Sequence, residues 1–552
     1  MYKTLKLIIY RFTLLACLLI SKQTRGQTYS VILGRPTNNS ITLSFLFDQN
    51  VDFYIEYGTS NTNLSSKTNV FFNTANIPDE IDITSLSANS RYYYKIQYKQ
   101  LGASSYKQSP IYSFQTQRTV GNGFTFTIES DEHLYDKKGI ASIYQICLNN
   151  QAQDNPDFML SLGDIFGDDH NPYTITSNEL DLLHKNYRPY LGSICHSIPF
   201  FVCLGNHEGE NDYFQTITPP NNLTTYGTYW RKYYYPNPSP NNFYSGNTDI
   251  EPFGIGSPEN YYAWTWGDAL FVVLDVYRYQ NSKSDKPQGW DWSLGAKQYN
   301  WLKLTLENSN SKFKFVFAHH IRGQGRGGIT NAKLFEWGGY EQDGSTYTFN
   351  TNRPSMAKPI HQLFKDTKVN IFFQGHDHLF AHEVLDGVHY QEVPMPSDST
   401  YMIGKLANAD AYVSDTIDGT GHIRVTVNNS CIKVDYVKAY LPKDTINGLH
   451  KNKEIGFSYI VGGCSVTSIE PVNSSILADD IKVFPNPAKN KIYIDLKNNL
   501  KNFNATLTDN NGEIIINSTS KEISISNLIP GIYYLKIVNG SFFTTKKIII
   551  NN

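Results

Sequence analysis

The pattern of hydrophobic and polar positions divides the chain into regions of different structure. From residue 28 to about 118, apolar and polar residues alternate in short runs such as VDFYIEYG, with Asn, Ser, Gly and Pro between them. Such runs are typical of half-buried strands joined by turns, and they predict a β-sandwich. From 122 to about 460, strand-like runs such as FMLSLGD alternate with helical stretches such as GAKQYNWLKLTLENS, which predicts an α/β layered domain.

The two ends of the chain carry further segments. Residues 479–552 are rich in Asn and alternate again, which predicts a small β-sandwich, and the polar stretch 465–478 is its predicted linker. Residues 1–26 combine a basic start, the apolar run FTLLACLLI and a polar exit, as in a signal peptide. An uncleaved, membrane-anchored helix is the alternative for this segment. No later run is long and apolar enough to cross a membrane, so no span is expected in the mature chain.

Composition narrows the classes of function. The chain has 552 residues with 48 Lys+Arg and 50 Asp+Glu, a net charge of −2, so neither a basic nucleic-acid-binding surface nor a disordered acidic chain is indicated. Aromatic residues make up 14%, which favours strand-rich structure. The cysteines show no CxxC spacing, so the sequence predicts neither a zinc knuckle nor a complete disulfide framework. The sequence indicates no oligomeric state.

Five short polar motifs follow strand-like runs of the α/β region. In chain order they are Asp131-Glu132-His133, Gly163-Asp164, Gly205-Asn206-His207-Glu208, His319-His320 and Gly375-His376-Asp377-His378. Open α/β sheets place their ligands at the carboxyl ends of the strands, so these side chains are expected to meet. They offer carboxylate oxygen, amide oxygen and imidazole nitrogen without thiolate, a combination that suits two hard-to-borderline divalent cations.

This ordered set resembles the calcineurin-like metallophosphoesterase superfamily over residues 122–460. Residues 28–118, with Leu86 followed by Tyr92 and with the run Tyr57-Gly58-Thr59, resemble the fibronectin type III-like N-terminal domain of purple acid phosphatases, so the whole architecture is similar to theirs. The resemblance implies a β-sheet sandwich flanked by helices. It also implies two divalent metal ions per chain, drawn from Mn, Fe, Zn or Co.

The resemblance implies a role for each motif residue. One metal would be held by Asp131, His133, Asp164 and His378, and the other by Asp164, Asn206, His319 and His376, with Asp164 bridging the two. A metal-bridging hydroxide would attack phosphorus in line. His207 is the expected general acid, and it counts with Asp164 as catalytic. Gly167 stands where purple acid phosphatases carry the tyrosine that ligates Fe(III), so a ferric-tyrosinate centre is not expected.

Three further residues are candidates for substrate binding. The family's apolar-x-x-His pattern fits Val316 to His319, so His319 is the expected ligand and His320 a pocket residue, although the sequence leaves the choice between them open. Arg322 and Arg326 lie in the Gly-rich run IRGQGRGG, where their guanidinium groups would suit a phosphate. A solvated surface loop is the equal alternative for this run.

The C-terminal region carries a resemblance of its own. Its opening run VFPNPA, its GIY hairpin and its basic ending KKIII resemble a type A C-terminal sorting domain of the type IX secretion system of Bacteroidetes. The resemblance implies the type IX secretion machinery as a partner. It also implies export through the periplasm and the outer membrane to a secreted or cell-surface location.

The function predicted from these features is a secreted, dinuclear, metal-dependent phosphoester hydrolase. The first expectation is an acid-phosphatase-like phosphomonoesterase. A phosphodiesterase acting on nucleotides or glycerophosphodiesters is the alternative within the same chemistry, because the motifs do not distinguish the two. A non-catalytic surface binding module is the alternative from a different class, and the complete set of ligand residues argues against it.

Overall fold

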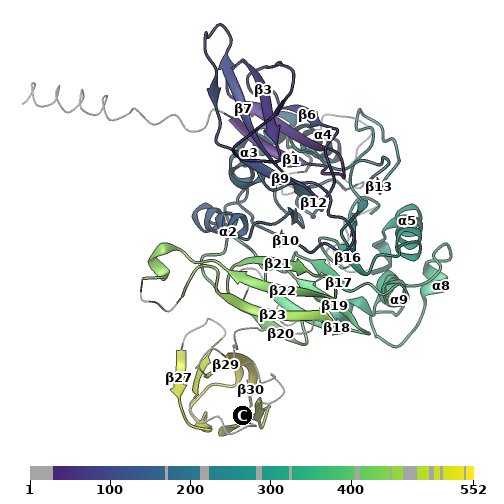
Figure 1. Cartoon of the computed structure of the whole chain (residues 1–552). Helices are drawn as coiled ribbons and strands as arrows, with labels where there is room; N and C mark the ends of the chain where they lie inside the picture. The colour runs from purple at the N-terminus through teal and green to yellow at the C-terminus, as the bar shows by residue number, and fades with distance from the viewer. Residues whose placement is uncertain are drawn as a thin grey trace, which may run out of the picture. The chain divides into compact units, whose positions relative to one another are not determined.

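The structure is a computed structural model of the chain (Figure 1). It describes residues 29–167, 172–211, 223–280, 289–321, 326–403, 411–446, 448, 450–463, 481–496, 503–509, 514–539 and 542–551. The predicted signal peptide and the predicted linker lie outside these residues. The chain divides into two compact units, Met1–Gly463 and Cys464–Asn552.

The first unit begins with two antiparallel sheets. One contains β1 (Tyr29–Gly34), β2 (Ile41–Phe47) and β6 (Asp79–Ile83). The other contains β3 (Val51–Gly58), β4 (Ser66–Lys67), β5 (Phe71–Asn73), β7 (Arg91–Gln100), β8 (Lys107–Gln108) and β9 (Tyr112–Gln115). Val31, Phe45, Phe53 and Phe114 are fully buried in one core between them. The alternation of the sequence thus produces the predicted β-sandwich, because every second side chain of a strand points to the same face.

This sandwich packs on helix α3 (Ser177–Cys195). Tyr94 donates to the backbone oxygen of His196 at 2.6 Å, and the rings of Tyr112 and His196 stack with their centroids 4.1 Å apart. Arg188, a fully buried residue of α3, donates to the Ser30 hydroxyl at 3.0 Å. These buried contacts join the sandwich to the α/β region within the first unit.

The α/β region is built on two larger sheets. The six-stranded sheet has the order β12 (Phe200–Val202), β11 (Phe158–Ser161), β10 (Phe124–Glu129), β21 (Gly421–Val427), β22 (Cys431–Lys438) and β23 (Ile455–Gly462). The eight-stranded sheet has the order β13 (Ser245–Gly246), β14 (Tyr262–Trp266), β15 (Ala269–Val273), β16 (Phe313–Phe317), β17 (Ile371–Gln374), β19 (Val388–Glu392), β18 (Phe380–Leu385) and β20 (Asp415–Ile417). Strands β10, β11 and β12 run parallel, as do β15, β16 and β17, so their carboxyl ends point the same way within each sheet.

Aromatic side chains fill the space between these two sheets. Phe126 of β10, Phe271 of β15 and Phe373 of β17 belong to one buried cluster. The outer faces are covered by α2 (Ala141–Gln153), α3 and α4 (Leu223–Tyr234) on one sheet and by α5 (Gly295–Glu307) and α9 (Ile360–Asp366) on the other. Short helices complete the region: η2 (Gly289–Asp291), α6 (Ile329–Ala332), α7 (Phe335–Gly338), α8 (Phe349–Asn352) and η4 (Pro442–Asp444). The predicted sheet sandwich flanked by helices is confirmed.

The second unit is a small β-sandwich, as predicted. Its first sheet contains β24 (Ile481–Phe484), β25 (Lys491–Leu496) and β28 (Glu522–Ser524). Its second contains β27 (Ile514–Ser518), β26 (Asn504–Thr508), β29 (Gly531–Asn539) and β30 (Phe542–Ile550). Ile492, Leu507, Leu535 and Ile548 are fully buried between the two sheets.

Two further features of the described residues concern membranes and cysteines. Among the described helices, none is long and apolar enough to cross a membrane. Cys431 is disulfide-bonded, whereas Cys147, Cys195 and Cys203 are free and buried.

Candidate metal centre

The five polar motifs lie in the loops that directly follow β10, β11, β12, β16 and β17. Five of their residues have positive backbone φ angles between 47° and 76°: Asp131, His133, Asp164, His376 and His378. Such backbone is rare for residues with a side chain, costs on the order of 1–3 kcal/mol each, and concentrates at functional sites. The tight turns bring side chains from both sheets to one place.

Asp131 lies at the centre of one group of imidazoles. One carboxylate oxygen, Oδ2, accepts a hydrogen bond from the backbone N–H of His376 at 2.8 Å. The other, Oδ1, is buried and has no hydrogen-bond partner. This oxygen lies 3.4 Å from His378 Nε2, 3.8 Å from His319 Nε2 and 3.9 Å from His133 Nε2. It therefore faces three ring nitrogens.

Asp164 lies between His319 on one side and His133 and His207 on the other. Its Oδ1 accepts a hydrogen bond from the backbone N–H of His207 at 2.8 Å. Its Oδ2 lies 3.2 Å from His319 Nε2, 3.9 Å from His207 Nε2 and 4.0 Å from His133 Nε2. One carboxylate oxygen is thus close to imidazoles on both sides.

The ring nitrogens also face one another. His133 Nε2 lies 3.0 Å from His378 Nε2, and His319 Nε2 lies 3.2 Å from His376 Nδ1. Three groups of side chains have ligand atoms close enough to share one ion: Asp131, His133 and His378; Asp164, His319 and His376; His133, Asp164 and His207. The last group includes His207, which the sequence predicts to be a general acid.

The donor set fits divalent metal ions. Besides Asp131 Oδ1, the side-chain oxygen of Asn206 is buried without a hydrogen-bond partner. Buried polar atoms are nearly always paired, so the unpaired Asp131 Oδ1 beside converging imidazoles calls for a ligand. Oxygen and imidazole donors without thiolate suit Mn, Fe, Zn or Co.

The electrostatics favour cations at this position. Burial opposes ionisation of Asp131, but the imidazoles of His319 and His378 hold its pKa well below the ordinary value. Burial likewise opposes ionisation of Asp164, while His319 and His207 lower its pKa to about 2. The two carboxylates in turn raise the pKa of His319 to about 10 against the effect of burial. The site therefore holds fixed negative charge that a metal ion would neutralise in place of a proton.

Outer contacts hold two imidazoles in orientation. His133 Nδ1 lies 3.2 Å from Asp136 Oδ2 and 3.0 Å from the Tyr135 hydroxyl, and His319 Nδ1 lies 2.8 Å from the backbone oxygen of Leu162. In both rings this leaves Nε2 facing the centre. Such contacts to the remote nitrogen are typical of metal-binding histidines.

Glu208 has a structural role that the sequence analysis missed. Its carboxylate accepts hydrogen bonds from four backbone N–H groups: Asp164 at 3.0 Å, Ile165 at 2.8 Å, Phe166 at 3.2 Å and Gly205 at 2.6 Å. Burial, and then the charge of Asp164, raises its pKa to about 7. Glu208 thereby joins the loops after β11 and β12. Its place in the third motif was visible in the sequence, but its partners were not.

The candidate substrate residues have different surroundings. His320 is buried with its ring 5.0 Å from that of His376, and it belongs to none of the three ligand groups. Arg326 donates through Nη1 to Asp377 Oδ1 and to the backbone oxygen of His376, both at 2.9 Å. Arg322 lies outside the described residues.

Gly167 has no room for a side chain. A Cβ atom at this position would lie 1.9 Å from the backbone oxygen of His207 and 2.3 Å from Glu208 Cα. The backbone of the third motif therefore occupies the space that a tyrosine would need.

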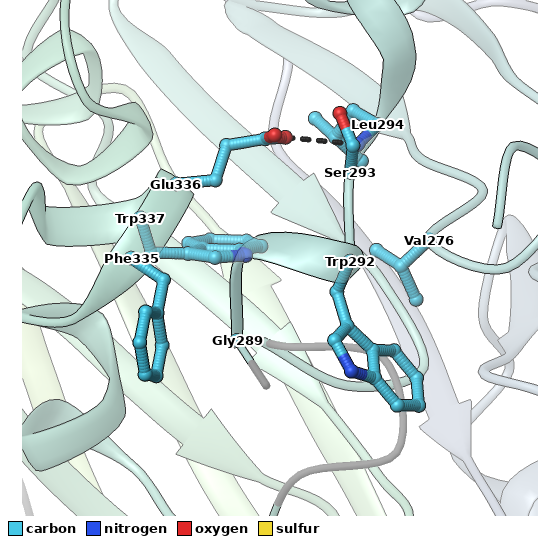
Figure 2. A pocket seen from close by; sticks show the side chains of 8 residues that line it. All are labelled: Val276, Gly289, Trp292, Ser293, Leu294, Phe335, Glu336 and Trp337. Carbon is cyan, nitrogen blue, oxygen red and sulfur yellow. Dashed lines mark hydrogen bonds between the residues drawn. The ribbon is translucent and has the colours of Figure 1, made fainter. Parts of the chain in front are cut away.

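A small cavity lies near the end of β15 and is shown in Figure 2. Its lining includes the aromatic residues Trp292, Phe335 and Trp337, and Glu336 accepts a hydrogen bond from the backbone N–H of Leu294 at 2.8 Å across it. Its volume of about 10 Å³ is room for a single water molecule. It is too small for a phosphoester.

Comparisons with known proteins concern the family and the fold of the chain. Residues 124–380 match the calcineurin-like phosphoesterase family, and residues 482–551 match the secretion system C-terminal sorting domain. The solved structure of PhoD is similar with a TM-score of 0.54 and 15% identity, covering 78% of this chain and 90% of that one. A purple acid phosphatase from yellow lupin (Lupinus luteus) seeds is similar with a TM-score of 0.51 and 14% identity, covering 81% and 77%. No curated protein matches the sequence.

At these identities the two solved structures show the fold alone. The fold class predicted from the hydrophobic pattern is confirmed, and so is the family resemblance predicted from the five motifs. The family uses divalent metal ions, and candidate ligand groups are present at the ends of the strands. The chain therefore contains a calcineurin-like phosphoesterase domain and a secretion system C-terminal sorting domain.

Proposed function

We propose that the chain hydrolyses phosphomonoesters at a centre of two divalent metal ions. Asp131, His133, Asp164 and His378 would hold one ion, and Asp164, Asn206, His319 and His376 the other. The observation that carries the proposal is the position of Asp164 Oδ2, within 4.0 Å of His319 Nε2 on one side and His133 Nε2 on the other. A carboxylate in that position can serve both ions.

Metal ions bound there would lower the pKa of water and neutralise charge on a phosphoryl group. The protein would supply the remaining chemistry. The His207 side chain is 17% exposed, whereas that of His319 is fully buried, so a substrate can reach the imidazole of His207 but not that of His319. Its Nε2 would donate a proton to the leaving oxygen. Arg326, at the edge of the centre, would bind a phosphoryl oxygen through its guanidinium group.

Export is the second part of the proposal. The sorting domain match at residues 482–551 supports delivery by the type IX secretion machinery to the cell surface or the medium. We divide the chain into a signal peptide at 1–26, a fibronectin type III-like sandwich at 28–118, a catalytic domain at 122–460, a linker at 465–478 and a sorting domain at 479–552. Fractionation of cells that express the full chain, with and without residues 479–552, tests this route.

The catalytic proposal is tested with the purified full chain. Hydrolysis of p-nitrophenyl phosphate and of bis-p-nitrophenyl phosphate is measured before and after chelation, with Mn, Fe, Zn and Co added back separately. We expect the monoester to be the better substrate. Faster hydrolysis of the diester would instead assign a phosphodiesterase. Inactivity on both esters with no metal bound would overturn the proposal.

A further inference from the structure

Arg326 is held at one end only. Its Nη1 group donates to Asp377 Oδ1 and to the backbone oxygen of His376, while the side chain as a whole is 35% exposed. Within the described part of the chain, its Nη2 and Nε groups have no hydrogen-bond partner. The fixed end lies next to a candidate metal ligand, and the free donors can meet a ligand from solvent.

Asp377 is held in turn by a buried cluster. Its side chain is fully buried, and Oδ2 accepts hydrogen bonds from the Tyr412 hydroxyl at 2.6 Å and from the Gly327 N–H at 2.8 Å. The Tyr412 hydroxyl also lies 3.0 Å from Glu392 Oε2, and Glu392 Oε1 accepts from the Asp377 N–H at 3.1 Å. We call Asp377, Glu392 and Tyr412 the carboxyl–tyrosine cluster.

The cluster holds two carboxyl groups and one hydroxyl group. A hydroxyl group has one proton, so Tyr412 donates to one of the two carboxyl groups at a time. Arg326 is the cation paired with Asp377, and its Nη1 lies 2.9 Å from Asp377 Oδ1. A buried group of this kind costs desolvation unless every member is paired, so the ion pair ties the cluster to the guanidinium group of Arg326.

We propose that Tyr412 and Glu392 are positioning residues that act through Asp377 to fix Arg326 beside the centre, so that its free N–H groups bind a phosphoryl oxygen of the substrate. The inference rests on the proposed function. A guanidinium group forms paired hydrogen bonds with phosphate oxygens. An arginine already held in place loses less conformational freedom when the substrate binds. Tyr412 and Glu392 are neither ligands nor substrate contacts in this arrangement.

A double-mutant cycle on the metal-loaded full chain tests this role. The variants are Tyr412→Phe, Arg326→Ala and the two combined, and the measured quantities are KM for p-nitrophenyl phosphate, kcat and the inhibition constant of inorganic phosphate. Arg326→Ala should raise KM and the phosphate inhibition constant by about 10- to 100-fold, the effect of losing hydrogen bonds to a charged group. Tyr412→Phe should raise both by up to about tenfold. In the Arg326→Ala background, Tyr412→Phe should have no further effect.

A matched control removes an equivalent hydroxyl elsewhere. Tyr440 is also buried, and its hydroxyl donates to Glu454 Oε1 at 2.8 Å, outside the candidate centre. Tyr440→Phe should leave KM and phosphate inhibition unchanged. Metal content and melting temperature are measured for every variant. Glu392→Gln is the second variant of the cluster, because it keeps the size of the side chain, and it should reproduce the KM effect of Tyr412→Phe.

The outcomes separate positioning from a general structural role. Equal effects of Tyr412→Phe with and without Arg326 would show that the cluster supports the fold alone, and an unchanged KM in both Tyr412→Phe and Glu392→Gln would also overturn the inference. If the wild-type chain hydrolyses neither ester, the proposed function fails first. Calorimetric binding of inorganic phosphate to the same metal-loaded variants then decides the positioning role independently of turnover.

Discussion

Replacing Asp164 by Asn should weaken metal binding at the candidate centre. The substitution keeps the shape of the side chain but removes a charge that lies 3.2 Å from His319 Nε2. Asp164 and Asp131 together raise the pKa of His319 from 6.5 to about 10 although burial opposes this. That rise corresponds to about 5 kcal/mol in favour of a single positive charge.

Asp164 is the larger of the two charge effects. Losing an interaction with a charged group costs about 1.5–3 kcal/mol, so binding of a unit charge should weaken by about 10- to 100-fold, and a divalent ion should be affected at least as strongly. We therefore expect Asp164→Asn to lose bound metal on dialysis and to lose hydrolysis with it. In the metal-free variant, the pKa of His319 should fall toward its ordinary value, which an NMR titration of the imidazole measures.

Asp154→Asn is the matched control for this prediction. Asp154 is also buried, contacts His422 Nε2 at 2.9 Å and has a pKa lowered to about 2, yet it lies outside the three ligand groups. Its replacement should reduce stability without changing metal content. If Asp164→Asn kept two equivalents of metal at unchanged affinity, the bridging role would be wrong.

Three further predictions address catalysis, metal and pH. His207→Ala should keep its metal and lower kcat on an ester with a poor leaving group by about 10²–10⁴-fold, and less on p-nitrophenyl phosphate; equal losses on both would argue against a general acid. Chelation should abolish hydrolysis and lower the melting temperature, since ions at a hundredfold excess over their Kd stabilise by about 2.7 kcal/mol per site; an unchanged melting temperature would contradict a bound metal. Burial raises the pKa of Glu129 from 4.5 to about 7. Between pH 4.5 and about 7 the native metal-free chain therefore binds more protons than the unfolded chain. The contribution of protonated Glu129 to the free energy of unfolding is complete below pH 4.5 and is lost as the pH rises to about 7. In urea unfolding measured across this pH range, the free energy of unfolding of Glu129→Gln should fall by about 3 kcal/mol less than that of the wild type. An unchanged pH dependence in the variant would refute the raised pKa of Glu129.

Local sequence information was sufficient for the overall architecture and for the candidate ligands. The strand periodicity of residues 28–118 depends only on which side chains face a core, and it predicted the sandwich that the structure contains. The five motifs were recognisable because each follows a strand, and the parallel order of β10, β11 and β12 places three of them at one sheet edge. Their residue types alone indicated divalent metal ions.

Contacts between distant segments were decided by the tertiary structure. The separate environments of His319 and His320 follow from the loop geometry after β16, which adjacent positions in a sequence do not reveal. The four backbone donors of Glu208, and the pairing of Arg326 with Asp377, join segments far apart along the chain. Periodicity reports only which face of an element is buried. The partner of a buried charge is set by which loops the folded sheets bring together, and that information appears only in the packed structure.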